Sequence, residues 1–397
     1  MRTRLIFCFL SLFVLNFCLC CPFAAEAAPT PKSKNAETKT RAVKKGTAKA
    51  APAKKTTGKN SSGATGKSAP VPAGKSAPAP GDPAPATENA AARVCAILDK
   101  PYAAQGGEIQ PSWQPLLQKL QSDPKLNADV SGWFRGMQDY SPQPMGEKIK
   151  ELFKKDFMRR PPKDDGIPKP PPSRIYRNVV TPVNVQKCRD FLTANQKAFA
   201  AVEDNYPVPR NILVSLLFVE TRLGVFVGKD NAFWSLACMA AADAPQRLKG
   251  AALDVPIGAQ HDEWLARRLK EKSSWAYNEL RSLLIFCRAN RIDPRILPGS
   301  AYGAIGICQF MPSNITSYAD DGDKDGRINL FSPPDAIFSA ARYLSKNGWS
   351  KGMGVEGQRK ALKRYNNLNI YANTILALAE SIRSGVIQTG PPDQRKR

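Results

Sequence analysis

The chain has 397 residues and carries 58 Lys and Arg against 34 Asp and Glu, a formal net charge of +24. This excess indicates a polyanionic partner, such as nucleic acid, anionic lipid or an acidic wall polymer. A single histidine, His261, argues against a His-ligated zinc site and against a Ser-His-Asp triad. The catalytic groups that remain are carboxylates, tyrosines, amides and hydroxyls.

Residues 1–27 have the pattern of a signal peptide. Arg2 and Arg4 precede an apolar run at 5–19 that is too short to span a bilayer comfortably, and Ala25-Glu26-Ala27 offers a small-residue cleavage site. We therefore expect a periplasmic protein, with association to the outer membrane left open, and no nucleic-acid partner. Two alternatives are an uncleaved membrane anchor and a lipoprotein acylated at one of the cysteines that end the run, Cys18, Cys20 and Cys21.

Residues 28–90 consist mostly of Ala, Lys, Pro, Thr, Gly and Ser, with almost no large apolar side chain. Such a segment cannot bury enough surface to offset its conformational entropy, so we expect a disordered linker. We expect a solvated tether, and its scattered lysines leave open a loose, salt-sensitive association with the anionic wall or membrane.

Five cysteines follow the signal, and an odd number leaves at least one thiol unpaired in a monomer even in an oxidising compartment. Their pairing is not predicted; they are Cys95, Cys188, Cys238, Cys287 and Cys308.

Residues 91–175 read as an N-terminal helical and Pro-rich region. Amphipathic periodicity predicts helices at 113–120 and 145–157, and the proline run at 160–173 predicts an extended segment. Residues 176–390 are mostly helical in pattern and form the expected catalytic domain. The fold class that we predict is mainly α, with a small β element near the cleft.

The segment 207–224 predicts a buried helix that ends in a carboxylate. The helix would have almost no polar face. Its apolar residues are Ile212, Leu213, Val214, Leu216, Leu217, Phe218 and Val219. Pro209 suits the first turn, and Gly224 suits a left-handed C-cap. Glu220 lies in the last turn, where burial and the helix dipole both raise the pKa of a carboxyl. A carboxyl protonated near neutral pH is what a general acid requires, so Glu220 is the catalytic candidate. The alternative is a glutamate paired with Arg222 or exposed at the surface.

The segment 299–313 is rich in small residues and then turns aromatic and polar. Its glycines allow the backbone to approach a substrate, and the side chains of Ser300 and Gln309 can form hydrogen bonds with sugar amides and hydroxyls. A tight turn packed on a helix is the structural alternative. The absence of a G-K-[ST] sequence argues against a phosphate-binding loop.

The segment 321–335 begins with the D-x-D-x-D-G pattern of an EF-hand loop. The twelfth position is Ser332 in place of Glu, and Asp335 can close a longer loop. Asp335 also suits the third position of a helix with Ser332 as N-cap and Pro333 at N1. We expect a structural cation site here.

With these features in this order, the chain resembles the membrane-bound lytic transglycosylase B family of murein-cleaving enzymes. The resemblance runs from TPVNVQ at Thr181 through VETRLG, GSAYGAIGICQFMPS, DGDKDGRINLFSPPDAI and SAARYLSKNGW to YNNLNIYANTILALA, about half of the chain. It implies a lysozyme-like fold. The chain departs from the family's more common residues at Ala301-Tyr302, Arg327 and Leu368.

The resemblance implies a role for each matching residue. Glu220 matches the single catalytic acid/base of the E-T-x-x-G motif. The family's substrate-binding groups match Ser300, Gln309, Tyr343 and Tyr365. Its structural Ca²⁺ loop matches Asp321, Asp323, Asp325 and Asp335.

The implied reaction is cleavage of the β-1,4 bond between N-acetylmuramic acid and N-acetylglucosamine in peptidoglycan glycan strands, which leaves a 1,6-anhydromuramic acid end. Two alternatives remain: a non-catalytic peptidoglycan-binding protein on the same scaffold, and a lysozyme-type hydrolase. A hydrolase needs a second carboxylate across the cleft, and the sequence does not identify one.

Overall fold

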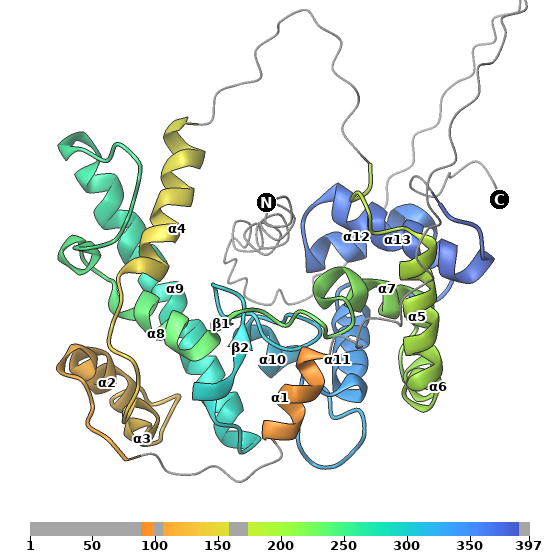
Figure 1. The fold of residues 1–397 in the computed structure, drawn as a ribbon, viewed down its shortest axis with the longest axis horizontal. Coiled ribbons are helices and arrows are strands. Elements are labelled where there is room, and N and C mark those ends of the chain that lie inside the picture. Colours follow the sequence, from red (N-terminus) through yellow and green to blue (C-terminus); the bar gives the residue numbers. More distant parts are fainter. Residues whose placement is uncertain (1–88, 99–105, 159–173, 389–397) are drawn as a thin grey trace, which may run out of the picture. The chain divides into compact units, whose positions relative to one another are not determined.

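The computed structural model describes residues 89–98, 106–158 and 174–388, which belong to one compact unit (Figure 1). The predicted signal peptide, the proline run and nearly all of the predicted linker lie outside the described residues. The helices are α1 (Ala90–Leu98), α2 (Gln114–Gln121), α3 (Ser131–Phe134), α4 (Gln143–Phe153), α5 (Pro182–Ala194), α6 (Gln196–Asn205), α7 (Arg210–Thr221), α8 (Ala232–Ala241), α9 (Asp262–Ala289), α10 (Pro312–Tyr318), α11 (Pro333–Lys346), α12 (Val355–Tyr365) and α13 (Asn369–Ser384).

The strands are β1 (Asp230–Asn231) and β2 (Pro298–Gly299), and the 3-10 turns are η2 (Pro111–Trp113), η4 (Pro245–Leu248), η5 (Ala259–His261) and η6 (Pro294–Ile296). A π-helical turn, η3 (Lys154–Met158), extends α4. The mainly helical fold with a small β element is therefore confirmed. The helices predicted at 113–120 and 145–157 correspond to α2 and to α4 with η3.

Helix α7 lies at the centre of the packing, as its lack of a polar face predicts. Its residues from Ile212 to Phe218 are all buried. Helices α5, α11 and α13 contact it, and Figure 1 shows α13 running beside it. Because other helices surround α7, Glu220 at its C-terminal end also lies among neighbouring elements.

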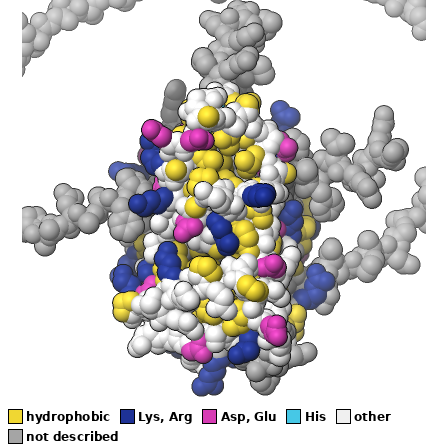
Figure 2. All heavy atoms as spheres, turned by 90° about the vertical axis from the view of Figure 1, so that its left-hand side faces the viewer, with side chains coloured by type: hydrophobic (Ala, Val, Ile, Leu, Met, Phe, Trp, Pro, Cys, Tyr) yellow, Lys and Arg dark blue, Asp and Glu magenta, His cyan; other side chains and the backbone are white. Residues whose placement is uncertain are grey.

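The second large packing group consists of α8, α9, α10 and α4. The 28-residue helix α9 packs along α8 and α10, and α4 contacts both α8 and α9. On the face shown in Figure 2, basic and acidic side chains are interspersed, so no single basic patch covers it.

The small antiparallel sheet joins two segments that are distant in the sequence. Asp230 pairs with Gly299, and Asn231 pairs with Pro298. The backbones approach so closely that a Cβ on Gly228, whose φ is +106°, would lie 2.0 Å from the Gly299 carbonyl oxygen. The sheet therefore holds the loop after α7 against the glycine-rich segment.

The ends of α7 differ from the sequence prediction. Pro209 is the N-cap rather than a residue of the first turn, and the left-handed C-cap is Arg222 rather than Gly224. Gly224 is also left-handed, with φ +90°, but it lies two residues further on. The helix ends earlier because the Leu223 amide donates to the Leu217 carbonyl, which closes a Schellman-type turn.

In the described part of the chain, four cysteines are buried free thiols: Cys188, Cys238, Cys287 and Cys308. Among the described residues, no helix is long and apolar enough to cross a bilayer.

Candidate active site

Glu220 lies in the last turn of α7 and faces Tyr371 of α13. The Tyr371 hydroxyl donates to Glu220 Oε1 at 2.6 Å, and the tyrosine itself is 1% exposed. Glu220 is half-buried as a residue, and its carboxyl is removed from bulk water. Burial raises the pKa of Glu220 to about 7, while the hydrogen bond from Tyr371 acts in the opposite direction. A carboxyl with this pKa can both donate and accept a proton near neutral pH.

Three further groups share the electrostatic surroundings of Glu220. Burial raises the pKa of Tyr176, Tyr365 and Cys308, and the negative charge of Glu220 raises each of them further. Tyr176 and Tyr371 were not among the residues predicted from the sequence. Tyr371 is in the last segment of the resemblance, YNNLNIYANTILALA, but nothing in that segment shows which tyrosine contacts the glutamate.

The residues after Glu220 explain the E-T-x-x-G pattern. The Thr221 hydroxyl donates to the Ile307 carbonyl at 2.8 Å and accepts the Gly224 amide at 3.0 Å. Thr221 therefore fixes both the turn and the glycine-rich segment beside it. The Arg222 guanidinium lies over the Phe218 ring at 4.6 Å, which differs from the alternative in which it pairs with Glu220.

The two polar residues predicted in the glycine-rich segment hold that segment in shape. Ser300 Oγ accepts the amides of Tyr302 and Ala304 at 3.3 and 3.0 Å. The buried Gln309 has a left-handed backbone, with φ +50°, and its amide donates to the carbonyls of Gly306 and Val227 at 3.0 and 3.3 Å. Their contacts with a substrate stay predictions.

Tyr302, one of the departures from the family pattern, is directed toward α4. Its hydroxyl donates to Glu151 Oε2 at 3.0 Å, and the ammonium of the fully buried Lys148 lies 4.3 Å from its ring centroid. Lys148 also pairs with Glu151 at 3.1 Å. This buried cluster connects the N-terminal region to the glycine-rich segment.

The predicted tyrosines on α11 and α12 belong to an aromatic cluster. Their ring centroids lie 4.7 Å apart, and both rings contact Phe310. The Tyr343 hydroxyl donates to the Arg364 carbonyl at 2.7 Å, and the Tyr365 hydroxyl donates to the Cys308 carbonyl. The Tyr365 ring is in turn stacked with that of Tyr371 at 6.4 Å, so the cluster extends to the residue that contacts Glu220.

Three aspartates of the acidic loop are close enough for one cation. Carboxylate oxygens of Asp321, Asp323 and Asp325 lie within 4.8 Å of one another. Two oxygens bound to the same Ca²⁺ can be at most about 5 Å apart, since each Ca–O distance is about 2.5 Å. The donors are all hard oxygens, which suits calcium. Burial and the neighbouring aspartates raise the pKa of Asp323, as expected for crowded carboxylates without a counterion.

Asp335 closes the loop through backbone hydrogen bonds. Its Oδ1 accepts the Gly322 amide at 2.8 Å, and its Oδ2 accepts the Asn329 amide at 2.6 Å. Burial raises its pKa to about 7, and the charges of Asp321 and Asp323 add to this. Ser332 is the N-cap of α11, as predicted, although its hydroxyl makes no capping hydrogen bond.

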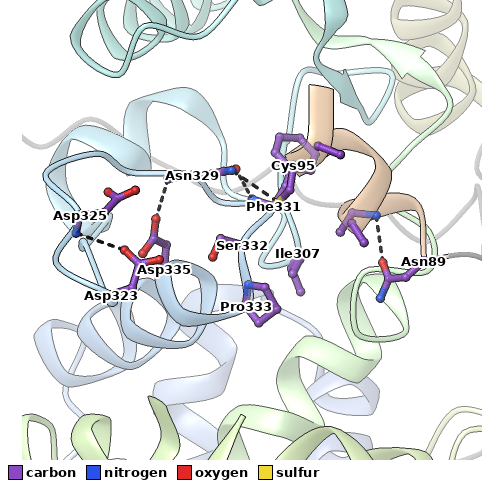
Figure 3. A pocket seen from close by; sticks show the side chains of 13 residues that line it. Asn89, Cys95, Ile307, Asp323, Asp325, Asn329, Phe331, Ser332, Pro333 and Asp335 are labelled. Carbon is purple, nitrogen blue, oxygen red and sulfur yellow. Dashed lines mark hydrogen bonds between the residues drawn. The ribbon is translucent and has the colours of Figure 1, made fainter. Parts of the chain in front are cut away.

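Arg327, another departure, is turned away from the loop. Its guanidinium donates to the Asn290 carbonyl at the end of α9, and Asn290 Oδ1 accepts the Ile328 amide. On its other side the loop borders a pocket of about 550 Å³ that is shared with α1 (Figure 3).

Comparison with known families places residues 156–360, just over half of the chain, in the family described as the transglycosylase SLT domain. The chain belongs to this family. Glu220, the glycine-rich segment and the acidic loop all lie inside the SLT domain. Helix α1 and nearly all of the region up to η3 precede it, and Tyr365 and Tyr371 follow it.

The chain is also 33% identical over 179 residues to membrane-bound lytic murein transglycosylase B of Escherichia coli. The match covers 45% of this chain and 42% of the relative, so the chain spans less than half the length of that curated relative.

Two solved structures are similar to this chain. The soluble lytic transglycosylase SltB1 of Pseudomonas aeruginosa matches at 22% identity and a TM-score of 0.47, covering 69% of this chain and 99% of that one. An Escherichia coli lytic transglycosylase in complex with calcium matches at 22% identity and a TM-score of 0.46, covering 71% and 96%.

Proposed function

We propose that this protein is a lytic transglycosylase that cleaves peptidoglycan glycan strands, with Glu220 as its single general acid/base. The observation that carries the proposal is a carboxyl with a pKa of about 7, partly buried at the end of the central helix and oriented by Tyr371. Membership of the SLT domain family and the identity to the curated murein transglycosylase support the substrate class.

The first step is proton donation. Glu220 protonates the glycosidic oxygen between N-acetylmuramic acid and N-acetylglucosamine, and the bond from that oxygen to the muramyl anomeric carbon breaks. The N-acetylglucosamine leaves with a free 4-hydroxyl. The positive charge that develops on the muramyl ring is stabilised by the ring's own acetamido group.

The second step uses the same carboxyl as a base. The Glu220 carboxylate takes the proton from the 6-hydroxyl of the muramyl residue, and that oxygen bonds to the anomeric carbon to give the 1,6-anhydro ring. Glu220 is protonated again, and no water is consumed. An internal nucleophile avoids the entropy cost of recruiting a second molecule, which explains how one carboxylate suffices.

The surrounding residues orient the reacting groups. Tyr371 orients the glutamate through its hydrogen bond. The Tyr365 ring stacks on that of Tyr371 and packs in turn against Tyr343. Ser300 and Gln309 shape the glycine-rich segment and contact the sugar acetamido and hydroxyl groups.

We further propose that the acidic loop binds one structural Ca²⁺ through Asp321, Asp323 and Asp325, with Asp335 closing the loop. The crowding of the three carboxylates supports this assignment. The ion neutralises their mutual repulsion and takes no part in proton transfer. Absence of any heat on titrating calcium into the metal-free protein contradicts this site.

The signal-peptide pattern of residues 1–27 and the basic composition of residues 28–90 support a periplasmic location for this activity. N-terminal sequencing of the protein recovered from a periplasmic extract tests the cleavage after residue 27.

The decisive experiment is digestion of purified sacculi, followed by mass spectrometry of the soluble products. The wild type releases muropeptides with 1,6-anhydro ends. Glu220→Gln lowers this release by at least about a hundredfold because the amide cannot transfer a proton. Glu263→Gln, an exposed glutamate on α9, is the matched control and keeps full activity.

Each competing function gives a different product pattern. Reducing muramic ends indicate a hydrolase, and binding to sacculi without soluble products indicates a non-catalytic protein. Anhydro products from Glu220→Gln at the wild-type rate contradict the assignment of the acid/base.

A further inference from the structure

The turn that follows Glu220 has an unusual backbone. Arg222, Leu223 and Gly224 are consecutive residues with φ values of +54°, +63° and +90°. Left-handed backbone is unfavourable for a residue other than glycine, so Arg222 and Leu223 are strained. Local hydrogen bonds close the turn, and contacts from the surrounding structure add to them in maintaining such a conformation.

Helix α1 supplies contacts to this turn from a segment more than a hundred residues away in the chain. Asn89 Nδ2 donates to the Leu223 carbonyl at 3.0 Å. The Ala91 amide is shared at 2.9 Å between the Gly224 carbonyl and Asn89 Oδ1. The carbonyls of Leu223 and Gly224 therefore both have donors from the start of α1.

The fit between α1 and the turn leaves no room for a side chain. A Cβ on Gly224 would lie 2.8 Å from the Ala91 Cβ and 3.3 Å from Ile307 Cγ1. Ile307 belongs to the glycine-rich segment, and its carbonyl accepts the Thr221 hydroxyl. The turn is thus enclosed by α1 on one side and by the glycine-rich segment on the other.

The same helix reaches the end of the acidic loop. Asn329 Nδ2 donates to Cys95 Sγ at 3.4 Å, and Figure 3 shows Cys95 of α1 beside Asn329, with Asn89 at the other end of the helix. One short helix therefore contacts the turn after Glu220, borders the glycine-rich segment and contacts the acidic loop.

From these contacts we infer that α1 is a positioning element for the active site and that Asn89 is its main positioning residue. The inference rests on the proposed function and extends the working enzyme beyond the SLT domain to residues before it. Asn89 does not touch the reacting atoms. Its amide holds the Leu223 carbonyl, and through the turn it keeps the Glu220 carboxyl in place and shielded from water.

Loss of this contact changes the surroundings of Glu220 in a defined direction. The ionisable groups that interact electrostatically with Glu220 carry no positive charge; they are Tyr371 on α13, Tyr365 on α12, Tyr176 and Cys308. Burial is therefore what raises the pKa of Glu220, and admitting water lowers it toward its ordinary value. Activity that needs protonated Glu220 is then lost at a lower pH.

The test compares Asn89→Ser with Asn89→Ala in the full chain. Serine keeps an N-cap oxygen for α1 but is too short to reach the Leu223 carbonyl. Asn205→Ala is the matched control, because Asn205 is exposed and its side chain donates only to the Ala201 carbonyl of its own helix. Steady-state kinetics are measured on soluble glycan oligomers prepared from sacculi, together with the pH dependence of kcat and the melting temperature.

We expect both Asn89 variants to lower kcat roughly tenfold, since a buried carbonyl loses its donor and the acid moves, with little change in KM. We also expect the alkaline limb of the kcat profile to move to lower pH, while Asn205→Ala matches the wild type.

A wild-type kcat and pH profile for Asn89→Ser overturns the inference. So does a loss that parallels the fraction of unfolded protein, since that indicates only a helix-capping role. A wild type that releases no anhydro products contradicts the proposed function instead, and the inference falls with it.

Discussion

The pKa of Glu220 results from two opposing effects. Burial disfavours the charged carboxylate and raises the pKa, whereas the hydrogen bond from Tyr371 stabilises the carboxylate and lowers it. The outcome, about 7, leaves both protonation states accessible near neutral pH. A single group can then act first as acid and next as base.

Tyr371→Phe removes the lowering effect and leaves burial in place. The pKa of Glu220 should rise, so the alkaline limb of the kcat profile should move to higher pH. The rate at the optimum should fall by roughly tenfold, because the carboxyl loses the group that orients it. The measurement is kcat against pH on soluble glycan oligomers.

Tyr277→Phe is the matched control for this substitution. The Tyr277 hydroxyl donates to Asp123 at 2.8 Å, away from Glu220, so its removal leaves the pH profile unchanged. A shift of the alkaline limb to lower pH in Tyr371→Phe would contradict the role assigned to the hydrogen bond.

At the scale of elements, the end of α7 is joined to the glycine-rich segment by one side chain. Thr221 is 1% exposed, and its hydroxyl bridges the Ile307 carbonyl and the Gly224 amide. A hydroxyl is needed here because it can donate to one group and accept from the other.

Thr221→Val keeps the shape of the side chain and removes both hydrogen bonds. The buried carbonyl and amide lose their partner, so the free energy of unfolding should fall by about 1–3 kcal/mol. Urea titration measures this, with Thr193→Val as the control at an exposed position of α5. Equal unfolding midpoints for the two variants would show that Thr221 does not join the two segments.

At the scale of the whole molecule, the acidic loop links α10, α11 and the end of α9. It runs from α10 to α11, and Asn290 at the end of α9 holds it through Arg327 and Ile328. A cation bound to the loop should therefore stabilise the folded state as a whole, since an ion that binds only the folded chain shifts the folding equilibrium.

Calcium at a hundred times its dissociation constant should add about 2.7 kcal/mol to the stability of the wild type. The melting temperature should rise by a few degrees and return on chelation. Asp323→Ala should lose this response, and Asp204→Ala, an exposed aspartate of α6, should keep it. Equal calcium responses in wild type and Asp323→Ala would argue against the site.

The local sequence by itself determined the central helix and the cluster of carboxylates, because both depend on residues that are close together in the chain. An unbroken apolar segment at 212–219 specified a central helix, because no polar face was left for solvent, and Glu220 followed at its end. The alternating aspartates of 321–325 specified a cluster of carboxylates, because a short loop keeps them together. The predicted helix end was less accurate. The C-cap is Arg222 rather than Gly224, because a Schellman-type turn closes before Gly224.

Tertiary structure alone decided which distant groups contact Glu220 and the turn that follows it. Tyr371 is 151 residues from the glutamate that it contacts, and Asn89 is 134 residues from Leu223. Tyrosine and asparagine are common on helices without any functional role, and hydrophobic periodicity does not distinguish one buried tyrosine from another. Their partners follow from how α1, α7 and α13 pack, which depends on the shapes of all the buried side chains together.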